Sequence, residues 1–255
     1  MARQLPHHGR LRIGTAGWSI PRAVAGDFAG EGSSLERFAG RFDAAEINSS
    51  FHRPHRPTTY ARWAASVPED FRFSVKLPKT ITHKARLVGC EAELEVFAEQ
   101  IAGLGSKRGP LLVQLPPSLS WSAEVAEPFF EAVTRTLGGP VALEARHPSW
   151  FAPDAEALLA SFHIAGVAAD PAPVPQAAAP RGTPALAYFR LHGAPRVYWS
   201  SYDAAQIAGL AERASAAAQD GAEVWVIFDN TASGAAAANA LELDALLRGD
   251  RAVAM

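Results

Sequence analysis

Short apolar runs that end in polar residues recur along the chain, most of them about 30 residues apart. Eight of them predict strands: Leu11–Gly17, Ala44–Ser50, Arg72–Leu77, Leu111–Leu115, Val141–His147, Ile164–Asp170, Leu186–His192 and Glu223–Asn230. Between most of these runs, apolar residues recur with the spacing of one helical face. Such faces are formed by Leu94, Phe97, Ala98, Ile101 and Leu104, by Val125, Phe129, Phe130, Val133 and Leu137, and by Ile207, Leu210, Ala211 and Ala214.

Strand followed by helix, repeated along the chain, predicts a parallel sheet. Eight repeats in 255 residues favour an α/β fold of one closed (β/α)8 barrel, a TIM barrel, over an open sheet. One repeat is irregular, because the segment from Pro171 to Pro184 holds five prolines and no helical period. Proline resists helix interiors, so the sixth crossover is predicted to be a loop or a single turn. We expect one domain over residues 11–250 and a disordered tail over residues 1–10.

Side chains alternate between the two faces of a strand, so parity separates positions that point into the barrel from positions that face the helices. One parity gathers most of the polar strand residues: Glu46, Asn48, Ser74, Lys76, Gln114, Glu144, Arg146, Asp170, Arg190, His192 and Asn230. Barrel interiors are normally apolar, and a buried charge is costly unless it is paired. These residues therefore form either an ion network that fills the core or a charged pocket at the carboxyl ends of the strands. The pocket is the favoured interpretation, because barrel enzymes place their chemistry there.

Composition narrows the classes of partner. The net charge of −2 gives no general attraction to nucleic acid or to an anionic membrane, so nucleic acid is possible as a partner but not indicated. Cys90 is the sole cysteine, which excludes an intrachain disulfide and a cysteine-rich zinc site. No signal peptide and no long apolar span is seen, so we expect a cytoplasmic protein without a membrane segment. The oligomeric state stays open.

Motifs at nearly all of the predicted strand ends share one resemblance. They are Gly14–Ser19, Glu46–Phe51, Lys76 with Thr82–Lys84, Gln114–Pro117, Glu144–His147 with Trp150, Arg190–Gly193 with Tyr202, and Phe228–Asn230 leading to Asn239–Ala240. Together they resemble the YecE-like family, a domain of unknown function that has a TIM-barrel fold. The resemblance implies the barrel and the map of the site, but it names no substrate. The chain departs from the usual pattern at His52, Ala16 and Asp229 and in the loop from Ile20 to Ser33.

Acid–base chemistry on a small anion is the leading functional hypothesis. Glu46 or Glu144 is the expected base and His192 or His83 the expected acid, because histidine titrates near neutral pH. Lys76, Arg146 and Arg190 are expected to hold a phosphorylated, sugar-like or nucleotide-like anion. Lys76 and Asp170 complete the candidate catalytic residues. The other expected substrate contacts are Trp18, Asn48, Gln114, Trp150, Gly193, Tyr202, Asn230 and Ser233.

One part of that site is expected to bind the anion itself. Barrels often bind phosphate at the loops after the seventh and eighth strands. Gly193 follows His192, and the small residues Thr231–Gly234 follow Asn230, with Arg190 on the adjacent strand. The alternative is that Ser233 merely caps the helix that follows.

Two other classes of function remain open. A binding or sensing module would capture an anionic ligand or a nucleic-acid end without turning it over. A metal-assisted hydrolase would use Glu46, Glu144, Asp170 and His192 as ligands. The three cations expected at the same place would repel a metal ion, so neither a metal nor another cofactor is predicted.

Overall fold

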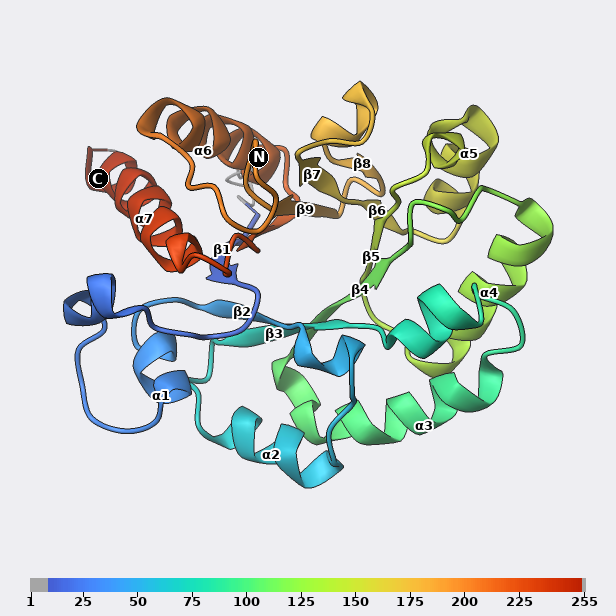
Figure 1. Ribbon diagram of the computed structural model, residues 1–255, viewed down its shortest axis with the longest axis horizontal. Coiled ribbons are helices and arrows are strands. Elements are labelled where there is room, and N and C mark those ends of the chain that lie inside the picture. Colours follow the sequence, from blue (N-terminus) through green and yellow to red (C-terminus); the bar gives the residue numbers. More distant parts are fainter. Residues whose placement is uncertain (1–8, 254–255) are drawn as a thin grey trace, which may run out of the picture.

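Eight parallel strands close into a barrel in the computed structural model, which describes residues 9–253 and the side chains up to residue 247 (Figure 1). The barrel is built from β1 (Leu11–Thr15), β2 (Ala44–Ile47), β3 (Arg72–Lys76), β4 (Arg108–Gln114), β5 (Val141–Glu144), β6 (Ala165–Gly166), β7 (Ala168–Asp170), β9 (Leu186–Leu191) and β10 (Glu223–Phe228). Strands β6 and β7 are two halves of one barrel strand that Val167 separates. The predicted TIM-barrel fold is therefore confirmed.

Closure of the barrel depends on the contact between β1 and β2. Ala16 forms a parallel bridge with Glu46, and the amide of Gly17 donates to the carbonyl oxygen of Glu46 at 2.8 Å. The two strands approach so closely that a Cβ atom on Gly14 would lie 2.0 Å from the carbonyl oxygen of Ala44. Only glycine fits at that position.

Seven helices among the described residues cover the outside of the barrel (Figure 1). They are α1 (Ser34–Ala39), α2 (Pro57–Ala65), α3 (Glu91–Ile101), α4 (Ala123–Thr136), α5 (Pro153–Ser161), α6 (Ala204–Gln219) and α7 (Ala235–Val253). The predicted helical faces lie inward, as in α3, where Leu94, Phe97 and Ile101 are buried. Capping boxes fix the first turns of α1 and α6.

The sixth crossover has no α-helix, as its prolines predict. A short 3-10 turn, Pro175–Ala178, and the two-residue strand β8 (Arg181–Gly182), antiparallel to β6, cover this part of the barrel. The expected disordered tail falls mostly on residues 1–8, which lie outside the described residues. Gly9 is described, and its amide donates to the carbonyl oxygen of Ala218 at 2.7 Å.

A separate apolar cluster fills the barrel below the charged layer. Its buried members are Ala44, Leu112, Ala142, Ala165, Val167, Ala169, Leu186, Tyr188, Trp225 and Ile227. Trp225 stacks on Tyr188 with ring centroids 6.2 Å apart. This cluster closes the barrel from below, so the charged side chains can meet solvent only at the carboxyl ends of the strands. In the described part of the chain, no helix is both long enough and apolar enough to cross a membrane.

Candidate functional site

Arg190 on β9 lies at the centre of the charged layer and is completely buried. Its Nε and Nη2 donate to the two carboxylate oxygens of Glu46 at 3.0 and 2.7 Å. Its Nη1 donates to Glu144 at 3.1 Å, and Nη2 lies 2.9 Å from Asp229. Burial opposes the charge, but the three carboxylates hold the pKa of Arg190 well above its ordinary value. Arg190 is therefore a structural cation, and its guanidinium has no group left for a substrate anion.

His192 bridges two of the same carboxylates. Its Nε2 lies 2.9 Å from Glu144 Oε1 and its Nδ1 lies 3.0 Å from Asp229 Oδ2. Burial lowers the pKa of His192, but Glu144 and Asp229 outweigh it and raise the pKa. The protonated ring donates from both nitrogens, so His192 is the second structural cation. The rings of His192 and Tyr198 lie 5.6 Å apart, edge to face, which leaves the imidazole 3% exposed.

Glu144 accepts hydrogen bonds from four side chains of the layer. Besides Arg190 and His192, it accepts from Gln114 at 3.0 Å and from Arg146 at 3.0 Å. Burial raises the pKa of Glu144, but His192, Arg190 and Arg146 hold it well below its ordinary value. Glu46 and Glu144 thus each lie within salt-bridge distance of Arg190. Neither carboxylate is free to act as a base.

Lys76, at the end of β3, stands apart from this network. It is 5% exposed, and its Nζ lies 4.2 Å from the centroid of the Phe51 ring. Among the described residues, Nζ has no hydrogen bond and no ion pair. Burial and then the charge of Arg190 lower the pKa of Lys76 to about 8, although Glu46, Glu144 and Asp229 each act to raise it. This amine is the one strong base in the layer that no carboxylate of the described chain neutralises.

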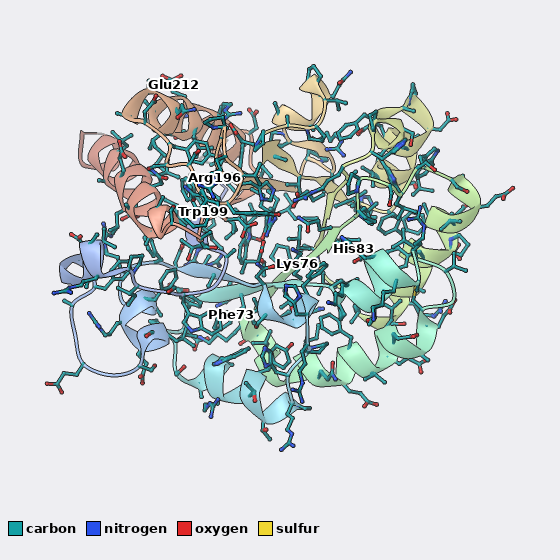
Figure 2. The ribbon with its side chains drawn as sticks, viewed as in Figure 1. Phe73, Lys76, His83, Arg196, Trp199 and Glu212 are labelled. Atoms are coloured by element: carbon teal, nitrogen blue, oxygen red, sulfur yellow. The ribbon has the colours of Figure 1, made fainter. Side chains whose placement is uncertain are left out.

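His83 lies beside Lys76, on a π-helical turn formed by Thr80–Lys84. The centroid of its ring lies 5.0 Å from that of Phe51, with the two rings nearly perpendicular, and its Nδ1 lies 2.8 Å from the hydroxyl of Thr82. Burial, then Lys76 and Arg146, lower its pKa. The imidazole is therefore neutral at pH 7. Figure 2 shows Lys76 and His83 together near the centre of the ring of helices.

Arg146 reaches the surface from the same layer, with 29% of its side chain exposed. Its Nε and Nη2 donate to Glu144, and Nη2 lies 3.5 Å from the hydroxyl of Tyr198. Nη1 has no partner among the described residues. Asn48 has a buried Oδ1 that also lacks a partner in the described chain. We call these four side chains the upper layer of the site: Lys76 is buried, and His83, Arg146 and Asn48 are partly exposed.

Asp170 does not point into the barrel, so that prediction is wrong. In the pairing of β7 with β9, Asp170 is level with Leu191, and Ala169 is level with Arg190. Ala165, Val167 and Ala169 carry the inward parity of this strand. Asp170 instead lines a cavity of about 430 Å³ beside α6, together with Tyr202 and Arg213.

The inward residue at the end of β10 is Asp229, not Asn230. Trp225 and Ile227 point inward, so the next inward position is Asp229. Asn230 lies on the other face, where its Nδ2 donates to Ser200 and Asn239. Sequence reasoning missed Asp229 because both parities of this strand are apolar. The sequence offers no signal that separates the two positions; the structure does, because Ile227 is level with Arg190 on the neighbouring strand.

Three other expected substrate contacts are structural. Trp18 packs edge-on against Trp63 at 4.9 Å, and Trp150 is 1% exposed with its indole nitrogen bonded to Leu119. Tyr202 is 5% exposed and accepts from the amide of Gly193 at 2.8 Å.

The expected anion site after β9 and β10 does not form from its predicted parts. The Gly193 amide is bonded to Tyr202, and Arg190 is bonded to its three carboxylates. Ser233 donates to the carbonyl oxygen of Trp199 at 2.6 Å and accepts from the amide of Ala235, as a helix cap does. The capping alternative therefore describes Ser233.

One serine and one histidine lie within hydrogen-bond distance of each other, a contact that no motif in the sequence predicts. Ser49 Oγ lies 2.7 Å from His55 Nε2 on the exposed loop after β2. No described carboxylate bonds the other ring nitrogen of His55, so the pair lacks the acid that orients the base in a catalytic triad. Among the described residues, no three His, Cys, Asp or Glu side chains are arranged to hold a metal ion.

Comparisons with known proteins agree with the motifs. The model of the family described as "Protein of unknown function DUF72" matches residues 12–254. The UPF0759 protein YecE of Escherichia coli K12 is 31% identical over 160 residues, which are 62% of this chain and 57% of that protein. The UPF0759 protein YunF of Bacillus subtilis 168 is 25% identical over 150 residues, 56% of this chain and 53% of that protein. The chain spans somewhat more than half the length of these curated relatives.

Solved structures share the fold. A DUF72 family protein from Enterococcus faecalis V583 superimposes with a TM-score of 0.79 at 24% identity, covering 93% of this chain and 95% of that one. A DUF72 family protein from Thermotoga maritima MSB8 gives 0.76 at 24% identity, covering 94% and 99%. The 3-keto-D-glucoside 4-epimerase YcjR from E. coli gives 0.52 at 15% identity, covering 94% and 100%, which indicates a similar fold alone.

Proposed function

Because the chain belongs to the DUF72 family, whose description gives no activity, we propose from its own residues that it is an enzyme that moves a proton on a small anionic substrate without a metal. The observation that carries this proposal is the pairing of an ammonium and a neutral imidazole on one aromatic ring. Lys76 Nζ lies over the face of Phe51, and His83 contacts the edge of the same ring. In acid–base catalysis, a neutral imidazole can accept a proton, and a cation beside it can stabilise the negative charge that forms on the substrate.

The charge balance of the layer supports an anionic substrate. Glu46, Glu144 and Asp229 are neutralised by Arg190, Arg146 and protonated His192. Lys76 is then the excess charge, and it is positive. An anion is the ligand that best compensates a buried positive charge without a partner.

Three residues of the upper layer each have one role in this proposal. Arg146 binds the carboxylate or phosphate of the substrate through its exposed guanidinium. His83 accepts the proton from carbon or oxygen, because its lowered pKa keeps the ring neutral at pH 7. Lys76 stabilises the negative charge that develops when the proton leaves. The buried ion network below holds Arg146 in position through Glu144.

Proton exchange tests this function directly. The purified protein is incubated in D2O with hydroxy acids, oxo acids and sugar phosphates, and NMR follows the loss of carbon-bound protons. We expect His83→Gln to lower the exchange rate about 10²- to 10⁴-fold, the usual contribution of a positioned base. His52→Gln is the matched control, because His52 also contacts Phe51, at 5.1 Å, but is exposed.

Two results contradict the proposal. Exchange that is unaffected by His83→Gln removes the histidine from the reaction. A ligand that raises the melting temperature through Arg146 but never exchanges a proton identifies a binding module instead.

A further inference from the structure

We propose that the amine of Lys76 forms an imine with the carbonyl carbon of a small oxo acid whose carboxylate is bound by Arg146. This inference rests on the proposed function of the same site and assigns its substrate class. The geometry that carries it is a lysine amine at the carboxyl end of a barrel strand, next to a histidine and to an exposed arginine, with no carboxylate bound to it.

The surroundings of Nζ differ from those of a lysine that only neutralises charge. Lys107, for comparison, donates to the carbonyl oxygen of Pro68 at 2.6 Å and pairs with Glu69 at 3.5 Å. Within the described part of the chain, the amine of Lys76 makes a cation–π contact with Phe51 but no hydrogen bond and no ion pair. Three carboxylates lie in the same layer, yet arginines and His192 take their oxygens. The amine is therefore left available for a ligand.

An amine must lose its proton before it can attack a carbonyl carbon. Burial and the neighbouring Arg190 lower the pKa of Lys76 to about 8 from 10.5. At pH 7.5 this lysine holds roughly 200-fold more free amine than a lysine with an ordinary pKa. A desolvated lysine beside another cation is the usual arrangement of an imine-forming lysine.

The reaction balances without an oxidant or a reductant. The lone pair of Nζ adds to the carbonyl carbon, and the carbonyl π pair moves to oxygen, which takes a proton from solvent. His83 accepts the proton that the nitrogen loses and returns it to the hydroxyl group, which departs as water. One amine, one carbonyl compound and one proton from solvent give one protonated imine and one water. The protonated imine then withdraws electrons from the adjacent carbon, whose proton His83 removes.

Arg146 determines the class of carbonyl compound. Both Lys76 and Arg146 lie near enough to His83 for their charges to lower its pKa. A guanidinium with an open Nη1 suits a carboxylate, and the amine suits the carbonyl next to it. A small oxo acid carries both groups within a few bonds.

Reductive trapping tests the imine. The protein is incubated at pH 7.5 with pyruvate and sodium cyanoborohydride, digested, and mapped by mass spectrometry. We expect N-carboxyethyl labelling at Lys76 at least about 10-fold above that at Lys79, Lys84 and Lys107, the remaining lysines of the chain. Equal labelling of all four, or none at Lys76, would overturn the proposal. Lys79→Arg leaves the label at Lys76 in place, and Lys76→Arg removes it.

A neutral probe tests the part played by Arg146. Acetaldehyde has the carbonyl group of pyruvate but no carboxylate. Arg146→Met should lower trapping of pyruvate about 10-fold and leave trapping of acetaldehyde unchanged, and an equal fall for both probes refutes the assignment of the oxo acid. These outcomes are separate from those of the proposed function. Proton exchange without labelling of Lys76 removes the imine alone, and labelling without exchange removes the proton transfer alone.

Discussion

Replacement of Arg190 by methionine tests the buried ion network most directly. Methionine fills much of the same volume, so the change removes the charge with little loss of packing. After the substitution, Asp229 keeps His192, and Glu144 keeps His192, Arg146 and Gln114. Glu46 keeps only the hydroxyl of Tyr188, which donates to it at 3.0 Å.

The expected loss of stability follows from the partners that each carboxylate keeps after the substitution. Removal of one partner from a buried ion pair typically costs about 3–5 kcal/mol, because the other charge stays buried. Arg190 and Glu46 are both completely buried, so water does not screen the loss. We expect Arg190→Met to lower the free energy of unfolding by about 3–5 kcal/mol near pH 8. The double variant with Glu46→Gln should recover about 1–3 kcal/mol, because a neutral amide needs no counter-charge.

The loss should depend on pH in a defined direction. Arg190 is one cause of the lowered pKa of Glu144 and Asp229 in the intact protein. Groups with a lowered pKa contribute stability above the pKa of the unfolded chain, and this contribution is lost as the pH falls through the folded pKa. Without Arg190 the pKa values of both carboxyls rise, so the variant loses most at high pH. The difference between the two proteins should therefore shrink from pH 8 to pH 5.

Urea unfolding, followed by tryptophan fluorescence at both pH values, measures these differences. Arg181→Met is the matched control, since Arg181 pairs with one half-buried carboxylate, that of Glu156, outside the network. A loss below about 1 kcal/mol for Arg190→Met, well under the range for buried pairs, would refute the argument. Additive effects of Arg190→Met and Glu46→Gln would do the same.

Four further outcomes follow from the same contacts. Arg146→Met should raise the pKa of Glu144, measured by carbon NMR titration, and an unchanged pKa means that the exposed guanidinium contributes nothing. Trapping of pyruvate by Lys76 should rise with pH through a midpoint of about 8, and a midpoint near 10 contradicts the desolvated environment. Elemental analysis of the purified protein should find no stoichiometric transition metal, and one metal per chain would favour a hydrolase instead. Gly14→Ala should destabilise the protein by at least about 1–3 kcal/mol in urea, because its Cβ would overlap the carbonyl oxygen of Ala44, and a stable variant would show that the β1–β2 contact yields.

The repeat pattern predicted the barrel because the pattern needs only two periods, that of side chains along a strand and that of side chains along a helix. Strand ends such as Glu46, Lys76 and Arg190 were placed correctly, since each lies on an unbroken strand whose parity can be counted. Both parities of the sixth strand are apolar up to Ala169, so its pattern did not show that Ala165, Val167 and Ala169 point inward and that Asp170 lies on the other face.

Strand parity predicts which residues point into the barrel, but it does not predict what each of them does there. Arg190, Arg146 and Lys76 share the same parity. Only the three-dimensional structure shows that the guanidinium of Arg190 contacts three carboxylates and that the amine of Lys76 contacts none among the described residues. Trp18 was expected to reach the upper face, yet the chain turns at Gly17, with φ of +82°, and the indole packs under α2. A positive φ at a glycine is allowed by the sequence but not required by it.

The sixth crossover should tolerate insertions that the other connections of the barrel would not. Elsewhere a connection must present an apolar helical face to the sheet, so a change in its length disturbs packing over several turns. Between Pro171 and Ala179, only Ala177 is buried. A peptide inserted there would lengthen an exposed loop, and loop closure costs only about 0.6 kcal/mol for each doubling of length. This segment is therefore a suitable place to join a reporter domain, because its residues bury little surface against the barrel.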